Sequence, residues 1–485
     1  MQYKTVVRLT GLFLMLFSFS MIPPLIICWK FAENICMPFV ESFGIILGCG
    51  YLLWRPFRHH HSLLKIREGF LIVVTIWFAI SFFASFPFLL FPELHQNHST
   101  IDILFEAVSG ITTTGASTFT DLDTLPNAIL YYRQQLQFIG GMGIIVLAIA
   151  IFPMLGMGGT HLFRLEVSSS HKENKLTPRI AQTAKLLWAI YCLITLACTW
   201  CFWYAGMDWF HALGESFSTV STGGFSMHDD SFFYYRSHAI EIFACVFMLI
   251  GSINFSLHYI ALQQHTLKNY WQDEEFRTYI IVFFLLIILI VGNLLLHNHF
   301  LRPKEQIIDS VFMIISIATT TGFSLIPFDD WASFDPILLI FMSLIGGCAG
   351  STTGGLKFLR LMVISKQSKR EFERLLHPQA SIPVKMDRNP IAENIIQSIT
   401  SFAFLYLGLF ALFILIFMAL GNDFITSFSS IAAALANSGT GDGQTSLNFK
   451  SISEPSKCLL IITMLLGRLQ IYPIFILFTR PFWKK

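Results

Sequence analysis

The sequence predicts an all-α integral membrane protein with about ten spans. Of its 485 residues, 54% are hydrophobic and only 13% are charged, and the mean hydropathy is +0.62. A water-soluble domain carries roughly 25% charged residues, so this composition excludes a soluble globular protein. Apolar runs long enough to cross a bilayer as helices recur along the chain. They cover residues 5–29, 37–54, 69–92, 136–157, 186–205, 239–262, 278–298, 336–364, 396–421 and 458–479.

Four shorter apolar runs alternate with the long ones, and each is too short to cross the membrane as a helix. They cover residues 102–113, 209–220, 306–319 and 424–436. We therefore expect two N-terminal helices followed by four repeats, each made of a span, a half-crossing pore helix and a second span (M1–pore helix–M2). The predicted boundaries are 1–68 for the N-terminal helix pair with its cytoplasmic loop, and 69–163, 164–268, 269–388 and 389–485 for the repeats.

The basic residues predict the orientation of the chain. With the N-terminus in the cytoplasm, 24 of the 32 Lys and Arg residues fall in cytoplasmic segments, seven fall on the opposite side, and Arg468 lies within a span. Because Lys and Arg concentrate in cytoplasmic loops, both termini are expected to be cytoplasmic. All four short runs then enter the membrane from outside.

Each short run ends in a related string of Thr, Ser and Gly. The strings are "ITTTGAS" at 111–117, "VSTGGFS" at 220–226, "ATTTGFS" at 318–324 and "ANSGTG" at 436–441. Aligned on the last glycine, Gly115, Gly224, Gly322 and Gly439 correspond, although Gly223 competes with Gly224 in the second string. The fourth string is the most diverged.

The composition of these strings suits a ring of backbone carbonyls. Glycine permits an extended turn that a β-carbon would obstruct, and the negative end of the preceding helix dipole favours a cation. Non-helical backbone at membrane depth is tolerated only where protein or a water-filled cavity satisfies it. Small residues also mark close helix packing in membranes. Four copies, each after a half-span, favour instead a pseudo-fourfold ring of oxygens that replaces the hydration shell of a cation.

The four repeats and the "TTTG" and "STGGF" strings resemble the Trk/Ktr/HKT superfamily of cation transporters over essentially the whole chain. The two extra N-terminal spans are similar to those of its TrkH/TrkG group of bacterial potassium-uptake subunits. The resemblance implies one filter glycine per repeat, and glycine in all four repeats goes with potassium preference. Members with serine at the position of Gly115 lean toward sodium.

The resemblance assigns the filter and its potassium ligands to these strings. The filter residues are Ile111, Thr112, Thr113, Thr114, Gly115, Val220, Ser221, Thr222, Gly223, Gly224, Ala318, Thr319, Thr320, Thr321, Gly322, Asn437, Ser438 and Gly439. The expected ligands of the potassium ion are Thr112, Thr113, Val220, Ser221, Thr319, Thr320, Asn437 and Ser438.

The run "LIGGCAGSTTGGLKF" at 344–358 interrupts the second span of the third repeat. Its five glycines each cost about 1 kcal/mol relative to alanine in a helix, which predicts a broken helix with a loop at membrane depth. A close-packed helix of small residues is the alternative. The resemblance implies an intramembrane gate. Its residues are Gly346, Gly347, Cys348, Ala349, Gly350, Ser351 and Thr352, together with Arg468.

Arg468 lies near the middle of the last span, in "MLLGRLQIYP". A lone arginine there costs at least about 2.5 kcal/mol on insertion scales, so it is expected to face an aqueous cavity or a partner. As a permanent cation it would oppose a passing cation. A buried ion pair between helices is the alternative. The family usually has "GRLE" here, whereas this chain has Gln470, which puts an arginine–glutamate pair in doubt.

The roles of three further charged residues, Lys357, Glu106 and Glu215, each have two interpretations. Lys357 is either a second pore-side cation or a side chain that reaches the membrane surface from a helix end. Glu106 and Glu215, each nine residues before a filter glycine, either draw cations in or support the pore helices, and their distance from the filter favours support.

The charged segment 365–387 is expected to form a short surface helix and a cytoplasmic docking surface. The family resemblance implies a homodimer in the lipid membrane above a ring of a soluble nucleotide-binding regulator, TrkA-like. No Walker or Rossmann motif occurs in this chain, so the sequence predicts no organic cofactor, and it predicts no nucleic-acid partner.

The sequence therefore predicts potassium uptake across a bacterial inner membrane, with potassium as the only bound ion. A sodium or non-selective member of the same superfamily is the first alternative. A membrane-embedded enzyme is the second, and the sequence shows no catalytic constellation that supports it.

Overall fold

The computed structural model describes residues 3–33, 35–60, 66–150, 180–296, 303–325, 331, 334–387 and 389–484. Several predicted features lie outside these residues. They are the ends of the runs 136–157 and 278–298, the boundary between the first two repeats at 163–164, and the basic residues Lys65, Arg164, Lys172, Lys175, Arg179, Arg302, Arg388 and Lys485.

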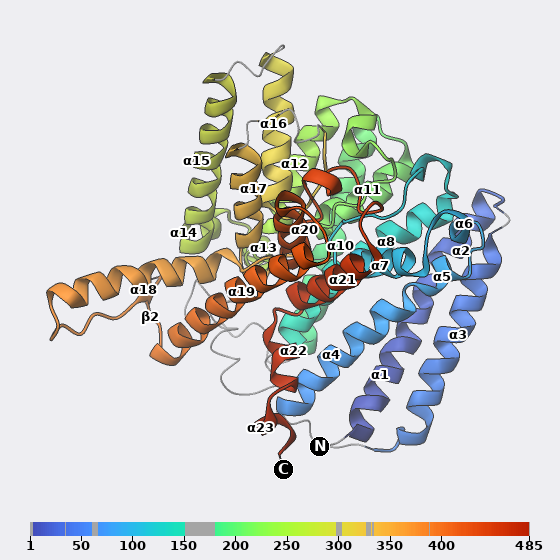
Figure 1. Cartoon of the computed structure of the whole chain (residues 1–485), viewed down its shortest axis with the longest axis horizontal. Coiled ribbons are helices and arrows are strands. Elements are labelled where there is room, and N and C mark those ends of the chain that lie inside the picture. The colour runs from blue at the N-terminus through green and yellow to red at the C-terminus, as the bar shows by residue number, and fades with distance from the viewer. Residues whose placement is uncertain are drawn as a thin grey trace.

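The described chain is almost entirely helical, as Figure 1 shows. The first part of the chain, up to residue 150, consists of α1 Tyr3–Ser18, η1 Phe19–Met21, α2 Ile22–Lys30, α3 Cys36–Trp54, η2 Arg55–Phe57, α4 Ile66–Phe83, α5 Phe86–Leu89, α6 Leu94–Asn97, α7 Thr100–Ile111, η3 Leu122–Thr124 and α8 Asn127–Ala150. The next part consists of α10 Ile180–Tyr204, α11 Trp209–Ser221, η5 Ser231–Tyr235, α12 His238–Ser252, α13 Phe255–Gln264 and α14 Lys268–Gln272.

The second half continues the pattern. It consists of α15 Glu274–Leu296, α16 Pro303–Ala318, α17 Phe334–Ile345, α18 Phe358–Leu376, β1 Lys385–Met386, β2 Asn389–Pro390, α19 Glu393–Ala419, α20 Phe424–Ala436, η7 Gly443–Thr445, α21 Glu454–Arg468, α22 Tyr472–Leu477 and α23 Arg480–Trp483. The two short strands pair antiparallel, Lys385 with Pro390 and Met386 with Asn389. The described chain thus has the all-α character that the sequence predicts.

Six helical segments among the described residues are long and apolar enough to cross a membrane, or seven if one bent pair counts as a span. They are Tyr3–Lys30, Cys36–Phe57, Arg67–Leu89, Ala184–Tyr204, Glu274–Leu296 and Glu393–Ala419. Large apolar side chains such as Phe284, Ile288 and Phe404 are exposed on their outer faces. Exposed apolar surface on this scale is typical of helices that face lipid.

Three predicted spans are broken in the structure. The sequence predicts one span over 239–262, but the structure bends by 97° between α12 and α13. The run 458–479 was also expected to be one helix, but it divides into α21 and α22 because Gln470 and Ile471 adopt positive φ angles of 55° and 58°. The third break, between α17 and α18, is the one that the glycine run predicts.

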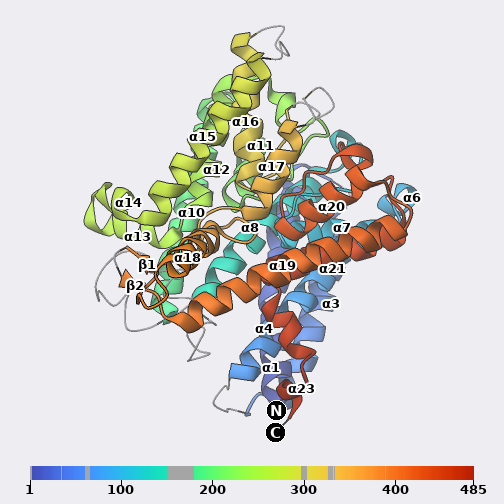
Figure 2. The same cartoon turned by 60° about the vertical axis from the view of Figure 1, so that its left-hand side comes forward.

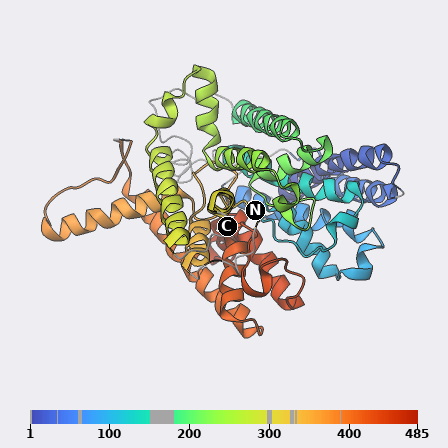
Figure 3. The same ribbon diagram turned by 90° about the horizontal axis from the view of Figure 1, so that it is seen from above.

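The four short helices α7, α11, α16 and α20 match the four predicted short runs. Each short helix packs against a long helix from the preceding quarter of the chain, and the first quarter follows the last. The pairs are α11 with α8, α16 with α12, α20 with α17, and α7 with α21. Figure 3 shows the corresponding green, yellow, red and cyan segments arranged around the middle of the molecule, with the blue N-terminal helices at its edge.

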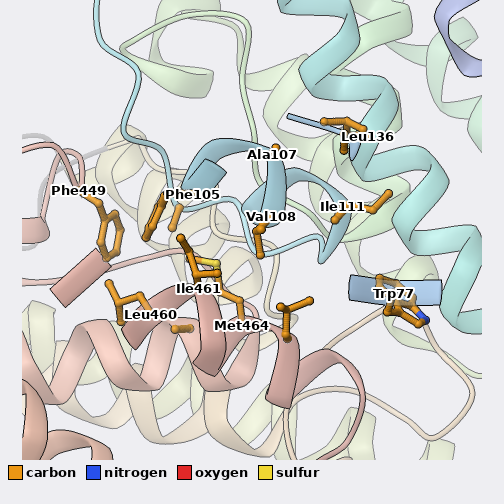
Figure 4. Packing of buried hydrophobic residues seen from close by; sticks show 14 of the residues in the cluster. Trp77, Phe105, Ala107, Val108, Ile111, Leu136, Phe449, Leu460, Ile461 and Met464 are labelled. Carbon is orange, nitrogen blue, oxygen red and sulfur yellow. The ribbon is translucent and has the colours of Figure 1, made fainter. Parts of the chain in front are cut away.

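Two buried hydrophobic clusters hold this arrangement. One joins the N-terminal helices and the first quarter to the last helices, and the other joins α10 to α18. In the first cluster, α7 lies between α8 and α21, with Phe105 and Val108 directed toward Leu460 and Met464 (Figure 4). Because lipid tails are as apolar as these residues, such contacts stabilise a membrane bundle through close van der Waals packing. The ends of the chain are thereby packed against its beginning.

One helix leaves the bundle. The second half of α18 projects away from the other helices, and Figure 2 shows both termini close together at one end of the molecule. The segment 365–387 was expected to form a short surface helix. It instead continues α18 without a break to Leu376 and then returns through the two short strands.

Candidate functional site

The four strings form a closed ring in which each aligned glycine faces the backbone of the next string. A β-carbon built on any of the four glycines would lie closer than 3.0 Å to a carbonyl oxygen of the neighbouring string. The contacts are Gly115 with Gly223, Gly224 with Thr321, Gly322 with Ser438, and Gly439 with Thr114. In each case the carbonyl belongs to the residue just before the next glycine. The ring therefore aligns Gly224, and not Gly223, with the other three glycines.

The backbone repeats the same conformation four times. Thr113, Thr222, Thr320 and Asn437, each two residues before its glycine, adopt φ angles of 51–57°, and all four glycines also have positive φ angles. A positive φ is a genuine outlier for a β-branched residue and costs on the order of 1–3 kcal/mol. Three threonines held in this conformation indicate that the surrounding structure imposes it.

The hydrogen bonds of the four helix ends explain how the strings leave the helices. The amide of the residue before each ring glycine donates to a carbonyl five residues earlier, at 2.8–2.9 Å in all four strings. The donor–acceptor pairs are Thr114 to Ser109, Gly223 to Ser218, Thr321 to Ser316 and Ser438 to Ala433. This is the Schellman pattern of helix termination. It directs amides back to the helix and brings four helix C-termini, each with a partial negative charge, to one ring.

The ring forms the floor of a cavity of about 570 Å³. All four ring glycines line it and are partly exposed, whereas the string residues before them are buried. Thr113 Oγ1, Asn437 Oδ1 and Ser438 Oγ are buried atoms with no hydrogen-bond partner within the described part of the chain. The Asn437 side chain is directed toward α21, where its Nδ2 donates to the Met464 carbonyl at 3.0 Å.

Two carboxylates brace the loops above the ring. Glu106 accepts hydrogen bonds from the Thr118 amide at 2.8 Å and from Arg133 Nη2 at 2.7 Å, and all of these groups are buried. Glu215 accepts from the Met227 amide at 2.9 Å, at the corresponding position of the second string. In both cases the acceptor lies nine residues before the ring glycine and the amide three residues after it. Of the two interpretations left by the sequence, the geometry favours structural support.

The loop 346–357 between α17 and α18 lies directly beneath the ring. Thr352 Oγ1 contacts the carbonyl of Val220 at 3.1 Å and that of Gly251 at 3.0 Å. The Gly354 amide donates to Thr320 Oγ1 at 3.0 Å, and a β-carbon on Gly354 would collide with the carbonyl of Ala436. The loop thus contacts the second, third and fourth strings at once. The alternative of a continuous small-residue helix is wrong.

Arg468 reaches this loop from the end of α21. Its Nη1 donates to the carbonyl of Thr352 at 2.9 Å, and its Nη2 donates to the carbonyl of Gly140 at 3.0 Å. The side chain is 2% exposed, and its Nε lacks a hydrogen-bond partner among the described residues. Both of these hydrogen bonds end on backbone carbonyls rather than on a carboxylate. The alternative of a helix-joining ion pair therefore receives no support from these contacts.

Lys357 is buried at the end of the same loop. Its Nζ donates to the Thr353 carbonyl at 2.5 Å and to Ser351 Oγ at 3.3 Å. The lysine therefore closes the loop on itself, and the interpretation as a side chain that reaches the membrane surface is wrong.

Comparison with known proteins gives concordant matches along the chain. A family model described as TrkH, a cation transport protein, matches residues 36–484. The Trk system potassium uptake protein TrkH of Vibrio parahaemolyticus is 43% identical over 486 residues, which cover all of both chains. TrkH of Escherichia coli K12 is 42% identical over all of both chains, and TrkG of the same strain is 39% identical over 99% of both. The crystal structure of the potassium transporter TrkH from Vibrio parahaemolyticus superposes with a TM-score of 0.92 at 42% identity and covers all of both chains.

The chain belongs to the TrkH family of cation transport proteins. The resemblance inferred from the strings is confirmed, and so is the fold class. Family membership places the chain among membrane transport proteins rather than enzymes, which removes the enzyme alternative.

In this TrkH-family chain, the eight residues expected to bind the ion do not form even layers, that is, sets of one residue per string at the same distance from the ring glycine. In the register of the ring glycines, Val220 is level with Ile111, one position before Thr112, and Ser438 is level with Thr114. Even layers are Thr114, Gly223, Thr321 and Ser438; Thr113, Thr222, Thr320 and Asn437; and Thr112, Ser221, Thr319 and Ala436. The sequence alone leaves the frame of the second string open, which is why the ligand set predicted from it mixes registers.

Two glutamines that the sequence does not single out, Gln134 and Gln137, hold the second string from the side. Gln137 Nε2 donates to the Gly223 carbonyl at 2.7 Å, and Gln137 Oε1 accepts from the Phe225 amide at 3.1 Å. Gln134 Nε2 donates to the Phe225 carbonyl at 2.9 Å. The sequence "RQQLQ" at 133–137 carries a signal for them, because four polar residues at the start of the predicted membrane run 136–157 need buried partners.

Gln470 pairs with Arg360 and not with Arg468, which lies two positions before it in the sequence. Its Oε1 accepts from Arg360 Nη2 at 2.7 Å, near the start of α18, and Arg360 also lies over the ring of Phe402 at 4.1 Å. The residue that replaces the usual family glutamate therefore connects the last span to the helix that follows the loop.

Proposed function

We propose that the chain conducts potassium ions into the cell through the ring of four strings. The observation that carries this proposal is the closed glycine–carbonyl ring, in which four equivalent backbone turns and four helix C-termini meet at one axis. Backbone carbonyls arranged in this way can replace the hydration shell of potassium. The relatives named as potassium uptake proteins and the glycine at all four positions support potassium over sodium.

The proposed ion ligands are the carbonyls of the even layers described above. The residues named from sequence, Thr112, Thr113, Thr319, Thr320, Ser221, Asn437 and Ser438, fall within these layers, whereas Val220 lies one step farther from the ring glycine. Potassium is the cargo of this site, and we propose that this chain holds no organic cofactor.

The loop 346–352 and Arg468 form the proposed gate. Support for this comes from Thr352, which contacts the second string and accepts from Arg468, and from Gly354 of the same loop, which contacts the third. An ion that leaves the ring would then have to displace the loop. A fixed guanidinium in a site of low dielectric adds electrostatic repulsion against a cation.

The remaining features of the proposal concern the whole assembly. Four repeats, with boundaries near 69, 164, 269 and 389, would surround the axis in a bacterial inner membrane with both termini in the cytoplasm. The protein would act as a homodimer in the lipid, controlled by a cytosolic nucleotide-binding ring of the TrkA type. The projecting part of α18 carries exposed Phe372, Leu375 and Leu376 and is a candidate surface for that ring.

The experiment that tests the function is growth rescue of a potassium-uptake-deficient bacterium at low potassium, with the regulator co-expressed. We expect rescue by the natural chain, and reduced discrimination against sodium in a Gly115→Ser variant. A chain that reaches the membrane in normal amount but fails to rescue growth would contradict the potassium proposal. Equal uptake of sodium and potassium by the natural chain would favour the non-selective alternative.

A further inference from the structure

Three potential metal ligands meet between α12 and α16, away from the ring and the loop. His238 and Glu241 lie one turn apart on α12, and Asp309 lies on α16. The ligand atoms of the three side chains all lie within 4.8 Å of one another. His238 Nδ1 is 2.8 Å from Glu241 Oε2, Glu241 is buried, and the His238 side chain is 49% exposed. We call these three residues the α12–α16 cluster.

The pseudo-fourfold arrangement shows what occupies the equivalent place elsewhere. Gly140, Gly251 and Gly467 are equivalent, because each faces the carbonyl four residues before a ring glycine: Ile111, Val220 and Leu435. Glu241 lies ten residues before Gly251, and Lys457 lies ten residues before Gly467. On the short helices, Asp309 and Asp102 each lie thirteen residues before their ring glycines. Glu241 and Asp309 are therefore the counterparts of Lys457 and Asp102.

At the equivalent contact between α21 and α7, the two residues form a buried ion pair. Lys457 Nζ lies 2.5 Å from Asp102 Oδ1, with both side chains less than 10% exposed. Between α12 and α16 the position of the lysine is taken by a carboxylate, so two acids face each other where the related contact has an acid and a base. Two such carboxylates repel each other unless a positive charge lies between them.

We propose that the α12–α16 cluster binds a divalent transition-metal ion of the zinc class between its three ligand atoms, at the place where Lys457 and Asp102 are paired in the equivalent contact. One imidazole nitrogen and two carboxylate oxygens are ordinary zinc ligands, at about 2.0–2.2 Å from the metal, and three protein ligands leave a fourth position for water. The imidazole with its borderline-soft nitrogen favours zinc, copper or nickel over magnesium or calcium.

The cluster is built so that binding requires little rearrangement. His238 and Glu241 come from successive turns of α12 and are already in contact, so the ion would replace the proton between them. Asp309 approaches from α16, which packs against α12. The half-exposed imidazole gives the ion access from solution. The bound metal would join α12 to α16, the short helix that ends in the third string.

The test is zinc binding by the full-length, tag-free protein in detergent, measured by equilibrium dialysis and by the thermal unfolding midpoint with zinc or with EDTA. We expect one zinc ion per chain and a rise of the midpoint with zinc. Cobalt in place of zinc should give the visible absorption of a four-coordinate site. None of these readouts depends on transport, so failure of the proposed function would leave the result unaffected.

The variants separate this site from other zinc-binding groups. Glu241→Lys rebuilds the ion pair seen at Asp102, so its midpoint in EDTA should equal or exceed that of the natural chain while its zinc affinity falls by about tenfold or more. His238→Ala should lose zinc affinity similarly and serves if Glu241→Lys fails to fold. The matched control is Glu93→Gln with His95→Ala, an exposed pair on and beside α6. Zinc binding by Glu241→Lys and His238→Ala at the natural affinity, or no binding by the natural chain, would overturn the proposal.

Discussion

Each ring glycine is required by two independent constraints at the scale of a single residue. Its φ angle is positive, which disfavours any other residue, and the space that a β-carbon would need is occupied by a carbonyl oxygen of the next string. The neighbouring Gly223 differs in both respects. Its φ angle is not in the positive range, and the three atoms nearest to a β-carbon on it all belong to the side chain of Gln137.

This difference gives a matched pair of substitutions. We expect Gly224→Ala to abolish potassium-dependent growth and to lower the thermal unfolding midpoint, because backbone cannot move away from the added methyl group. Gly223→Ala should retain measurable uptake, since the Gln137 side chain can change rotamer. Equal loss in the two variants, at equal amounts in the membrane, would contradict the register of the ring.

Arg468 gives a second prediction at this scale. In the proposed gate its charge opposes passing cations, so Arg468→Ala should increase potassium flux in proteoliposomes. The natural chain and Arg468→Lys, which keeps the positive charge, are the controls. A large loss of flux in the alanine variant would show instead that the contacts to Thr352 and Gly140 are needed to hold the pathway open.

At the scale of elements, the loop between α17 and α18 is the part that most affects the path. It contributes side chains and amides to three strings but is itself closed by Lys357. If the loop is the barrier, shortening residues 347–353 should raise flux in the absence of the cytosolic regulator. Unchanged flux in a shortened chain with a normal unfolding midpoint would rule out the loop as the gate.

The hairpin that follows α18 predicts a pH dependence of stability. Burial, with the nearby Asp273 carboxylate, raises the pKa of Asp387 to about 6 from 3.8, so the folded state holds a proton that the unfolded chain has released. The free energy of unfolding should therefore fall as the pH rises from about 4 through about 6. Asp387→Asn retains the oxygen that accepts from the Glu274 amide. We expect this variant to unfold at a higher temperature than the natural chain at pH 8 but at the same temperature near pH 4; the same difference at both values would contradict the assignment.

At the scale of the whole molecule, the ring closes only because the last quarter of the chain meets the first. The buried pair of Lys457 and Asp102 lies at this closure, together with the contacts of α7 to α21. Removing one partner of a buried ion pair costs about 3–5 kcal/mol. We expect Lys457→Met to lower the unfolding midpoint strongly, Lys450→Met to have little effect, and Lys457→Met with Asp102→Asn to recover part of the loss. An additive double variant would show that the two residues do not interact.

Much of this architecture could be predicted from the sequence, because periodic apolar runs and four related strings are local signals. The short helices, the break between α17 and α18, and the family all follow from such signals. The 97° bend after Ser252 and the break at Gln470 could not be predicted, since each depends on contacts with the distant loop and with α18. The register of the second string also required the structure, because only the neighbouring strings distinguish Gly224 from Gly223.

The single-chain ring has a consequence for how the protein can change over evolutionary time. In a pore made of four identical subunits, any substitution appears four times around the axis. Here each position is encoded separately, so one quarter can carry the loop 346–357, another Arg468, and a third the α12–α16 cluster, without copies elsewhere among the residues that the structure describes. Asymmetric parts can thus be gained or lost one at a time around a conserved backbone ring, which leaves regulation and ion selectivity free to evolve separately.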